Sequence, residues 1–348
     1  MFKEITTNNK SCILMKAIKN PKYGSKTVLT DSSWEYVALF LKRQSTHGSS
    51  DALFYWEQAH SFYLASQTLP DSASPLTSYY CILNATKALL RFKNVESSKL
   101  NNHGISSVRT DNDKTNLKEA KTAIKGAGVL PELTRYFDCQ LQPQHYSIFT
   151  LLYNIPCVHR AYCITFRKPE IFVPISHPVF VKKDGSKEAW LKFRIDGSYA
   201  NAKSLKHVPN KFEHDIGIST EYIMRMKKRF NWDIHDSIEN RRHKLSKYHT
   251  KTRKYIYYIY GESRLWYIKK DISDNSDLAL VPSSVLIFCV FHWISELVRY
   301  DPKLFQKYMK SKQNWLIHEF VKNGLNQFID ELSCEITGED IMCTGYRK

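Results

Sequence analysis

The chain has 348 residues, of which 43% are hydrophobic and 24% charged, and this composition is that of an ordinary globular protein. Its length allows two domains, or one large core with an insertion. The formal net charge is +17. Such an excess favours an anionic partner, most often nucleic acid, and the alternative is a lysine-rich surface without any partner. The chain has only 12 glycines, which argues against glycine-rich nucleotide-binding loops.

The cysteines and the hydropathy pattern indicate a cellular location. The 8 cysteines are scattered without a CxxC pair, as expected of reduced thiols in a cytoplasmic protein. No stretch has the ~20 apolar residues of a transmembrane helix. Residues 1–20 lack the apolar run of a signal peptide. We therefore expect a cytoplasmic protein with no membrane partner.

The first half of the chain has the spacing of helices. Residues 1–30 are expected to form loop and edge structure, and Asp31 then begins a helix as its N-cap. Trp34, Val37 and Leu41 recur at helical spacing in that helix. The predicted helices in this half span 31–43, 52–69, 76–93, 117–125, 131–137 and 145–162.

The pattern changes to short β-rich runs near residue 162. Alternation such as Trp190, Lys192 and Arg194 against intervening apolar residues indicates half-buried antiparallel strands. The predicted strands span 162–166, 171–174, 178–182, 189–195, 251–260 and 264–269.

The stretch from Ser283 to Pro302 predicts the central helix of the core. From Val285 to Ile294 only His292 interrupts an apolar run, and a helix that is apolar on all sides is buried on all sides. Ser283 or Ser284 is the expected N-cap, and the residue before Pro302 ends the helix. We expect His292 to be a hydrogen-bonded core histidine.

These elements together predict an α+β protein with a small antiparallel β insertion. Residues 1–160 would form an N-terminal helical region, and residues 161–282 a β-rich insertion that carries a basic run. Residues 283–348 would form a C-terminal helical region that packs on the N-terminal helices. The helical core would thus be built from both ends of the chain.

Two pairs of motifs resemble known families. The stretch SYYCILNATKALLRF (78–92) followed by NNHGI (101–105) resembles the tyrosine-rich helix and His-Gly turn of HEPN-type helical domains. The stretch FHWISELVRYDPKLFQKYM (291–309) followed by WLIHEFV (315–321) is similar to the end of the YaaC-like protein family. The match covers both flanks, about a third of the chain. The resemblance implies a bacterial cytoplasmic protein with a HEPN-like helical core.

The HEPN resemblance carries two further expectations. HEPN-type proteins are common in phage defence and toxin–antitoxin loci, as RNases or as non-catalytic partners, and their helices often pair across a homodimer. Active HEPN RNases carry an R-x4-6-H motif on a late helix. Arg299 lies on the matching helix without a histidine in range, and this departure argues against RNase activity. The literal match elsewhere is Arg242 with His249, which we keep as the alternative catalytic pair of a metal-independent RNase.

The basic run from Arg225 to Lys254 is the most informative surface feature of the sequence. Cations neutralise phosphates and release counterions, and exposed rings such as those of Tyr255, Tyr257, Tyr258, Tyr260, Trp266 and Tyr267 can stack on bases. The alternative is a solvated charged face beside strands with half-buried tyrosines. The candidate nucleic-acid-binding residues are Lys227, Lys228, Arg229, Arg241, Arg242, Lys244, Lys247, Lys251, Arg253 and Lys254.

A second candidate site lies on the predicted helix 76–93. Asn84, Lys87 and Arg91 share one face of this helix, and a solvated face is the simplest interpretation. If His103 folds back over that face, the four side chains would line a polar pocket able to hold an anion.

No other motif indicates chemistry. No His, Cys or Glu spacing matches a metal motif, and we expect no metal or cofactor. The leading hypothesis is a non-catalytic subunit that binds DNA, RNA or a protein partner, plausibly within a prokaryotic defence or stress system. The alternatives are the RNase and a protein–protein interaction scaffold without a nucleic-acid role.

Overall fold

The computed structural model describes residues 2–108, 115–139, 141–215, 222–261, 263–271, 278 and 280–343. It is an α+β protein, as the sequence predicts, and it divides into two compact units. The β-rich unit is formed from Met1–Leu29, Ile171–Ala279 and Gly338–Gly345. It thus takes in the start of the chain and a late segment as well as the middle. The helical unit is formed mainly from Thr30–Glu170 and Leu280–Thr337.

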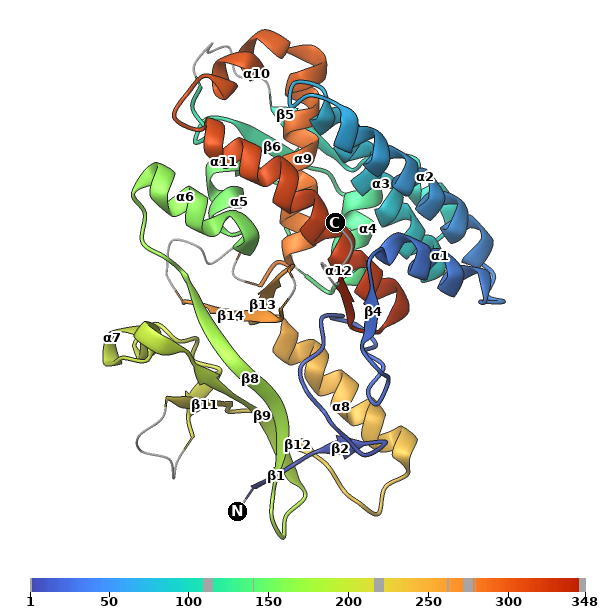
Figure 1. Cartoon of the computed structure of the whole chain (residues 1–348), viewed down its shortest axis with the longest axis vertical. Coiled ribbons are helices and arrows are strands. Elements are labelled where there is room, and N and C mark those ends of the chain that lie inside the picture. The colour runs from blue at the N-terminus through green and yellow to red at the C-terminus, as the bar shows by residue number, and fades with distance from the viewer. Residues whose placement is uncertain are drawn as a thin grey trace. The chain divides into compact units, whose positions relative to one another are not determined.

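The helical unit contains a bundle of helices and a small sheet (Figure 1). Its helices are α1 (Ser33–Lys42), α2 (Ser49–Thr68), α3 (Ser74–Phe92), α4 (Val129–Tyr136), α5 (Ile148–Tyr153), α6 (His159–Phe166), α9 (Ser283–Tyr300), α10 (Pro302–Met309), α11 (Asn314–Glu319) and α12 (Leu325–Thr337), with the short turns η1 (Ser97–Leu100) and η2 (Pro156–Val158). Its antiparallel sheet has the order β5 (Ile105–Val108), β6 (Lys121–Ile124), β7 (His145–Ser147).

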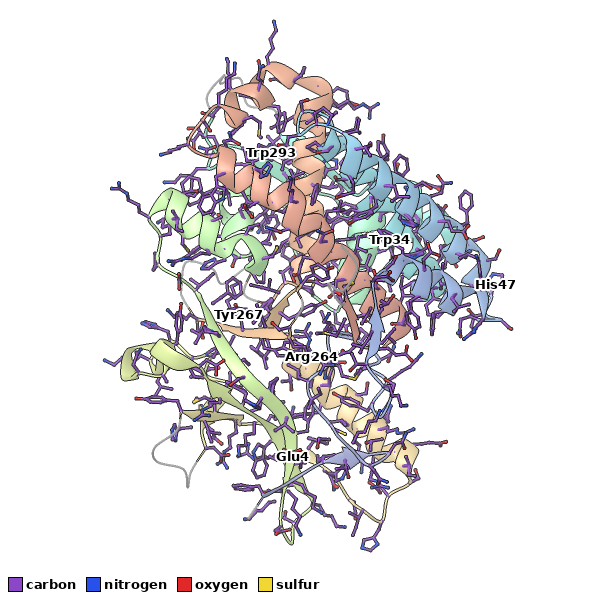
Figure 2. All side chains as sticks on the ribbon, in the orientation of Figure 1. Glu4, Trp34, His47, Arg264, Tyr267 and Trp293 are labelled. Atoms are coloured by element: carbon purple, nitrogen blue, oxygen red, sulfur yellow. The ribbon has the colours of Figure 1, made fainter. Side chains whose placement is uncertain are left out.

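Helix α9 is the centre of this unit, and the prediction of a buried central helix is confirmed. Every residue from Ser283 to Ser295 is buried. Helices α3 and α12 pack on α9 and on each other, and β5 and β6 also contact α9. Among the helices, Trp34 of α1 stacks on His60 and packs on Trp56 (ring centroids 4.9 and 4.6 Å apart; Trp34 is labelled in Figure 2).

The start of α9 differs from the predicted serine cap. Pro282 is the N-cap residue, and the buried carboxylate of Glu331 on α12 accepts from Ser283 Oγ (2.5 Å) and from the backbone N–H of Ser284 (2.9 Å). A carboxylate at a helix N-terminus satisfies free N–H groups and complements the helix dipole. The cap therefore comes from a residue nearly fifty positions away, beyond the reach of local sequence rules. A π-helical turn, η5 (Phe320–Gly324), joins α11 to α12.

The β-rich unit is built on a curled antiparallel sheet (Figure 1). Over the described residues this sheet has eight strands, so it is larger than the small insertion predicted. The central order is β10 (Phe212–His214), β11 (Ile223–Met226), β9 (Glu188–Ile195), β8 (Phe172–Lys183), β14 (Leu265–Lys269), β13 (Ile256–Ile259), with β1 (Phe2–Glu4) added to β8 and β12 (Phe230–Asn231) added to β9. Two small sheets pair β2 (Thr6–Thr7) with β3 (Lys10–Ser11) and β4 (Val28–Thr30) with β15 (Ile341–Cys343).

One helix, α8 (Ile238–Arg253), contributes Leu245 and Tyr248 to the core of the curled sheet. Phe180, Phe193 and Trp266 of the strands are buried in the same core. The unit also contains the short elements η3 (Gly197–Tyr199) and α7 (Ala202–Leu205). Strand β8 is continuous through Pro174 and Pro178, with a register shift between Ser176 and Val179. Pro178 lies at this shift, where proline is tolerated because no ladder hydrogen bond is required.

Four predicted elements are wrong in type, wholly or in part. The predicted helix 117–125 contains strand β6, and the predicted helix 145–162 begins with strand β7. The predicted strand 162–166 belongs to helix α6, and residues 251–253 belong to helix α8 and not to a strand. None of the described helices is long and apolar enough to cross a membrane.

Candidate nucleic-acid interface

Helix α8 carries most of the basic residues singled out in the sequence. Ser237 caps it, with its Oγ accepting from the backbone N–H of Asn240 at 3.1 Å. Leu245, Tyr248 and Thr252 follow one another at spacings of three and four residues and are buried. These spacings place them on one helix face, so the opposite face is left to solvent.

The solvent face of α8 presents a line of basic side chains. His243, Lys247 and Lys251 are exposed and lie four residues apart, which places them along one side of the helix. Lys254, at the C-cap, continues this line and is partly buried. Within the described part of the chain, no carboxylate pairs with Lys247 or Lys251. These two lysines are therefore available to an external anion.

A turn between β11 and β12 adds two more lysines. Lys227 and Lys228 are exposed and have no ion-pair partner among the described residues. The hydroxyl of Tyr248 on α8 donates to the carbonyl oxygen of Lys228 at 2.8 Å. This hydrogen bond connects the turn to α8, so both groups of lysines belong to one local structure.

Other cations of the basic run already have partners within the protein. Arg225 pairs with Glu213 (2.9 Å) and Asp215 (3.2 Å), and Arg229 pairs with Glu213 at 2.9 Å. Both guanidinium groups lie over the ring of Trp190. The hydrogen bond from Arg229 is the largest cause of a lowered pKa at Glu213. These arginines are therefore engaged in stabilising the sheet.

Four further candidates on α8 have local roles. Lys244 pairs with Asp236 at 2.5 Å, and Arg242 donates to Asn8 Oδ1 at 2.9 Å. The guanidinium of Arg241 lies 5.5 Å from the ring centroid of Trp232. Arg253 is buried and donates to the carbonyl oxygens of Ile256 and Lys16. Arg253 therefore acts in the core, whereas Lys244, Arg241 and Arg242 are engaged with neighbouring side chains.

The alternative catalytic histidine is enclosed by the protein. His249 has no exposed surface, its Nε2 donates to the carbonyl oxygen of Ala17 at 2.8 Å, and its Nδ1 accepts from Tyr23 Oη at 2.6 Å. Burial lowers the pKa of His249 to about 3, so the ring is neutral at pH 7. A neutral imidazole has one donor and one acceptor, and both are occupied here. This geometry favours a structural role for His249.

The aromatic residues after α8 mostly face inward. Tyr257, Tyr258 and Trp266 are buried within strands β13 and β14. Tyr255, Tyr260 and Tyr267 are partly buried. Base stacking on this segment is therefore limited to the partly exposed rings.

The predicted polar pocket of the helical unit takes a different form. Arg91 pairs with Asp51 at 2.6 Å and Asn84 donates to the carbonyl of Tyr80, while Lys87 lies over the ring of Tyr55. These three side chains therefore do not point to one common anion-binding site. Burial is the largest cause of a lowered pKa at His103, and the charge of Lys87 adds to it.

His103 belongs to a cluster that sequence reasoning missed. Its Nδ1 is 2.9 Å from Tyr79 Oη, and its ring contacts His292 of α9. His292 Nε2 lies 3.8 Å from Glu296 Oε1. The buried His292 is predicted to be hydrogen-bonded, but its Nδ1 has no partner in the described structure. The NHG turn and the lone histidine of an apolar helix are both visible in the sequence, but nothing in their spacing links them.

No metal centre is evident among the described residues, where no three His, Cys, Asp or Glu side chains gather closely enough to hold an ion. None of the 8 cysteines is in a disulfide bond.

Comparison with known proteins identifies the family. No curated protein and no solved structure matches the chain. The family described as YaaC-like Protein matches residues 17–336, which include most of both compact units. The chain therefore belongs to the YaaC-like protein family.

Proposed function

We propose that this protein is a nucleic-acid-binding subunit that contacts the phosphate backbone through the lysine surface, defined as Lys227, Lys228, Lys247 and Lys251. The observation that carries the proposal is that these four exposed lysines have no carboxylate partner within the described residues. They occur in a chain with a net charge of +17. Ammonium groups that are already neutralised by the protein release few counterions, whereas these four would release them on binding phosphate.

The form of the surface favours backbone contact over base recognition. Lysine is a flexible point charge, and the rings nearby are mainly buried, so few groups are placed to read base edges. The proposed binding is therefore independent of sequence. A cytoplasmic location is consistent with cysteines that form no disulfide bond, since thiols stay reduced in that compartment. A HEPN-like core, a homodimer and a place in a defence or stress system follow from the resemblance and stay predictions.

The test is binding of the full-length protein to labelled single- and double-stranded DNA and RNA. At ~50 mM salt we expect a complex with each, and at ~200 mM salt the affinity should fall by orders of magnitude. RNA recovered from the same samples should remain intact without divalent metal. Metal-independent cleavage would instead support the RNase alternative. No complex at the lower salt would contradict the proposal and favour a protein–protein scaffold.

A further inference from the structure

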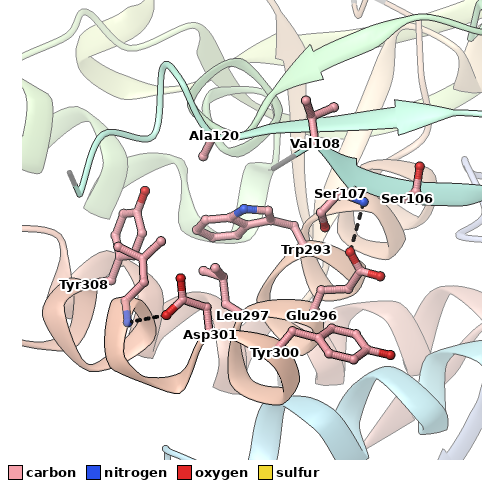
Figure 3. Close-up of a pocket in the computed structure, with 11 residues that line it drawn as sticks. Ser106, Ser107, Val108, Ala120, Trp293, Glu296, Leu297, Tyr300, Asp301 and Tyr308 are labelled. Atoms are coloured by element: carbon pink, nitrogen blue, oxygen red, sulfur yellow. Dashed lines mark hydrogen bonds between the residues drawn. The ribbon is translucent and has the colours of Figure 1, made fainter. Parts of the chain in front are cut away.

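A second candidate site lies wholly within the helical unit. A cavity of about 610 Å³ is lined by β5, by the C-terminal half of α9 and by α10 (Figure 3). Its size is within the range of ligand pockets, which hold ~300–1,000 Å³. The residues used below are Ser107, Trp293, Glu296, Tyr300, Asp301 and Tyr308, all of which line it.

The charge of the cavity is opposite to that of the chain. Its described lining residues include the carboxylates of Glu296 and Asp301 and include no lysine, arginine or histidine. The whole sequence has 51 lysines and arginines against 34 acidic residues, so the lining differs in sign from the chain as a whole. The field inside the cavity would attract a cation and repel phosphate.

Glu296 is held in place by the backbone of β5. Its Oε2 accepts the backbone N–H of Ser107 at 3.1 Å, which is drawn as a dashed line in Figure 3. Its Oε1 is 3.8 Å from His292 Nε2, and burial lowers the pKa of His292, so that ring is neutral at pH 7 and does not neutralise the carboxylate. The side chain of Glu296 is 34% exposed. A preorganised carboxylate with one open oxygen is suited to an ammonium group.

Trp293 supplies a hydrogen-bond donor on the cavity wall. It is 4% exposed, and Figure 3 shows its indole ring within the cavity wall. Its Nε1–H has no acceptor among the described residues and lies on the cavity wall, where a ligand could accept from it. Ser107 Oγ, on the same wall, is buried without a hydrogen-bond partner among the described residues, and this is an independent indication of a ligand. Both groups are satisfied if a ligand places an oxygen atom near them.

Aromatic rings complete the lining. Tyr308 packs edge-on against Trp293 with ring centroids 5.5 Å apart. Tyr300 lies on the turn of α9 beyond Glu296. Flat rings beside a carboxylate bind organic cations by combining cation–π attraction with an ion pair.

We propose that this cavity binds a small primary amine that carries an oxygen acceptor. The ammonium group contacts Glu296 and is attracted by the carboxylate of Asp301. The body of the ligand packs on Trp293 and Tyr308, and its oxygen accepts from Trp293 Nε1. The site is independent of the lysine surface, because it involves a ligand of opposite charge and residues of the other unit alone.

The test uses two isosteric probes with the full-length protein. Tyramine carries an ammonium group, an aromatic ring and a hydroxyl oxygen, and 4-propylphenol replaces only the ammonium by a methyl group. Isothermal titration calorimetry should show tyramine binding roughly tenfold or more tightly than 4-propylphenol, as expected for a charge-assisted contact. E296Q should remove this preference, and W293F should weaken tyramine while it keeps the aromatic packing. The matched control E35Q changes an exposed carboxylate of α1 and should leave binding unchanged.

Each outcome decides the proposal. Thermal melting establishes whether E296Q is folded, and if it is not, the preference between the two probes on the unaltered chain still tests the charge. Equal affinity for both probes, or no binding of tyramine at millimolar concentration, would overturn the proposal. Tyramine binding that survives in folded E296Q would overturn the assignment of Glu296.

Discussion

Replacement of His249 by leucine tests how the β-rich unit is held together. His249 connects α8 to the N-terminal segment through Tyr23 and the carbonyl of Ala17. Leucine fills most of the volume but leaves a buried hydroxyl and a buried carbonyl without partners. Each such orphan costs about 1–3 kcal/mol, so we expect H249L to lose roughly 3 kcal/mol of unfolding free energy at pH 7.5.

The same contact gives a pH dependence of known sign. The pKa of His249 is about 3 in the folded protein, against the ordinary histidine value of 6.5 in the unfolded chain. Because the folded pKa is lower, the stabilisation is fully present above pH 6.5 and is lost as the pH falls toward 3. At pH 5.0, about 1.5 units below the unfolded value, the loss is about 2 kcal/mol. The advantage of wild type over H249L should therefore shrink to about 1 kcal/mol.

Urea unfolding followed by tryptophan fluorescence at pH 7.5 and 5.0 measures both quantities. Comparison of the two proteins at each pH cancels the titration of all other groups. A difference that is the same at both pH values would refute the buried neutral state of His249. A difference below about 1 kcal/mol at pH 7.5 would refute its role in joining α8 to the N-terminal segment.

Three further changes test the packing of the described structure. G104A should destabilise the helical unit by more than about 3 kcal/mol, because Gly104 has φ +77° and a Cβ there would lie 2.3 Å from Pro131 Cδ. G185A, with φ +69° and open space around it, is the matched control and should cost only ~1 kcal/mol in the same thermal melts. F291A removes a fully buried ring and should cost about 3–5 kcal/mol in urea unfolding, and stability near wild type would contradict the packing of α9. E331Q weakens the cap of α9 and should cost ~1–2 kcal/mol, with an unchanged midpoint counting against the cap.

Elements whose burial is evident from a continuous run of apolar residues could be predicted from the sequence. Helix α9 is recognisable because an apolar run from Val285 to Ile294 can only be buried. Helix α8 is not recognisable in this way, because Leu245 and Tyr248 are the only large apolar residues on its buried face and many basic residues surround them. The 117–125 segment has a helical composition, but pairing with β5 and β7 makes residues 121–124 a strand. Tertiary pairing overrides local preference there.

The candidate sites show the same limit. The density of positive charge is visible in the sequence, but its division into paired and unpaired cations is not. Arg225 meets Glu213 and Asp215 only because β10 and β11 are adjacent. Likewise, Glu296 and Ser107 are nearly two hundred residues apart and meet only through the packing of β5 on α9. Such long-range pairs cannot be read from spacing in one sequence.

The salt dependence of duplex DNA binding tests the proposed lysine surface most directly. Two variants remove the same charge: K247Q/K251Q from the exposed face of α8, and K303Q/K310Q from exposed positions on and after α10. Each phosphate neutralised contributes about 0.9 to the slope of log affinity against log salt. We predict that the slope falls by roughly 2 in K247Q/K251Q and is unchanged in K303Q/K310Q. Equal slopes in all three proteins, or an equal fall in both variants, would contradict a phosphate contact at α8.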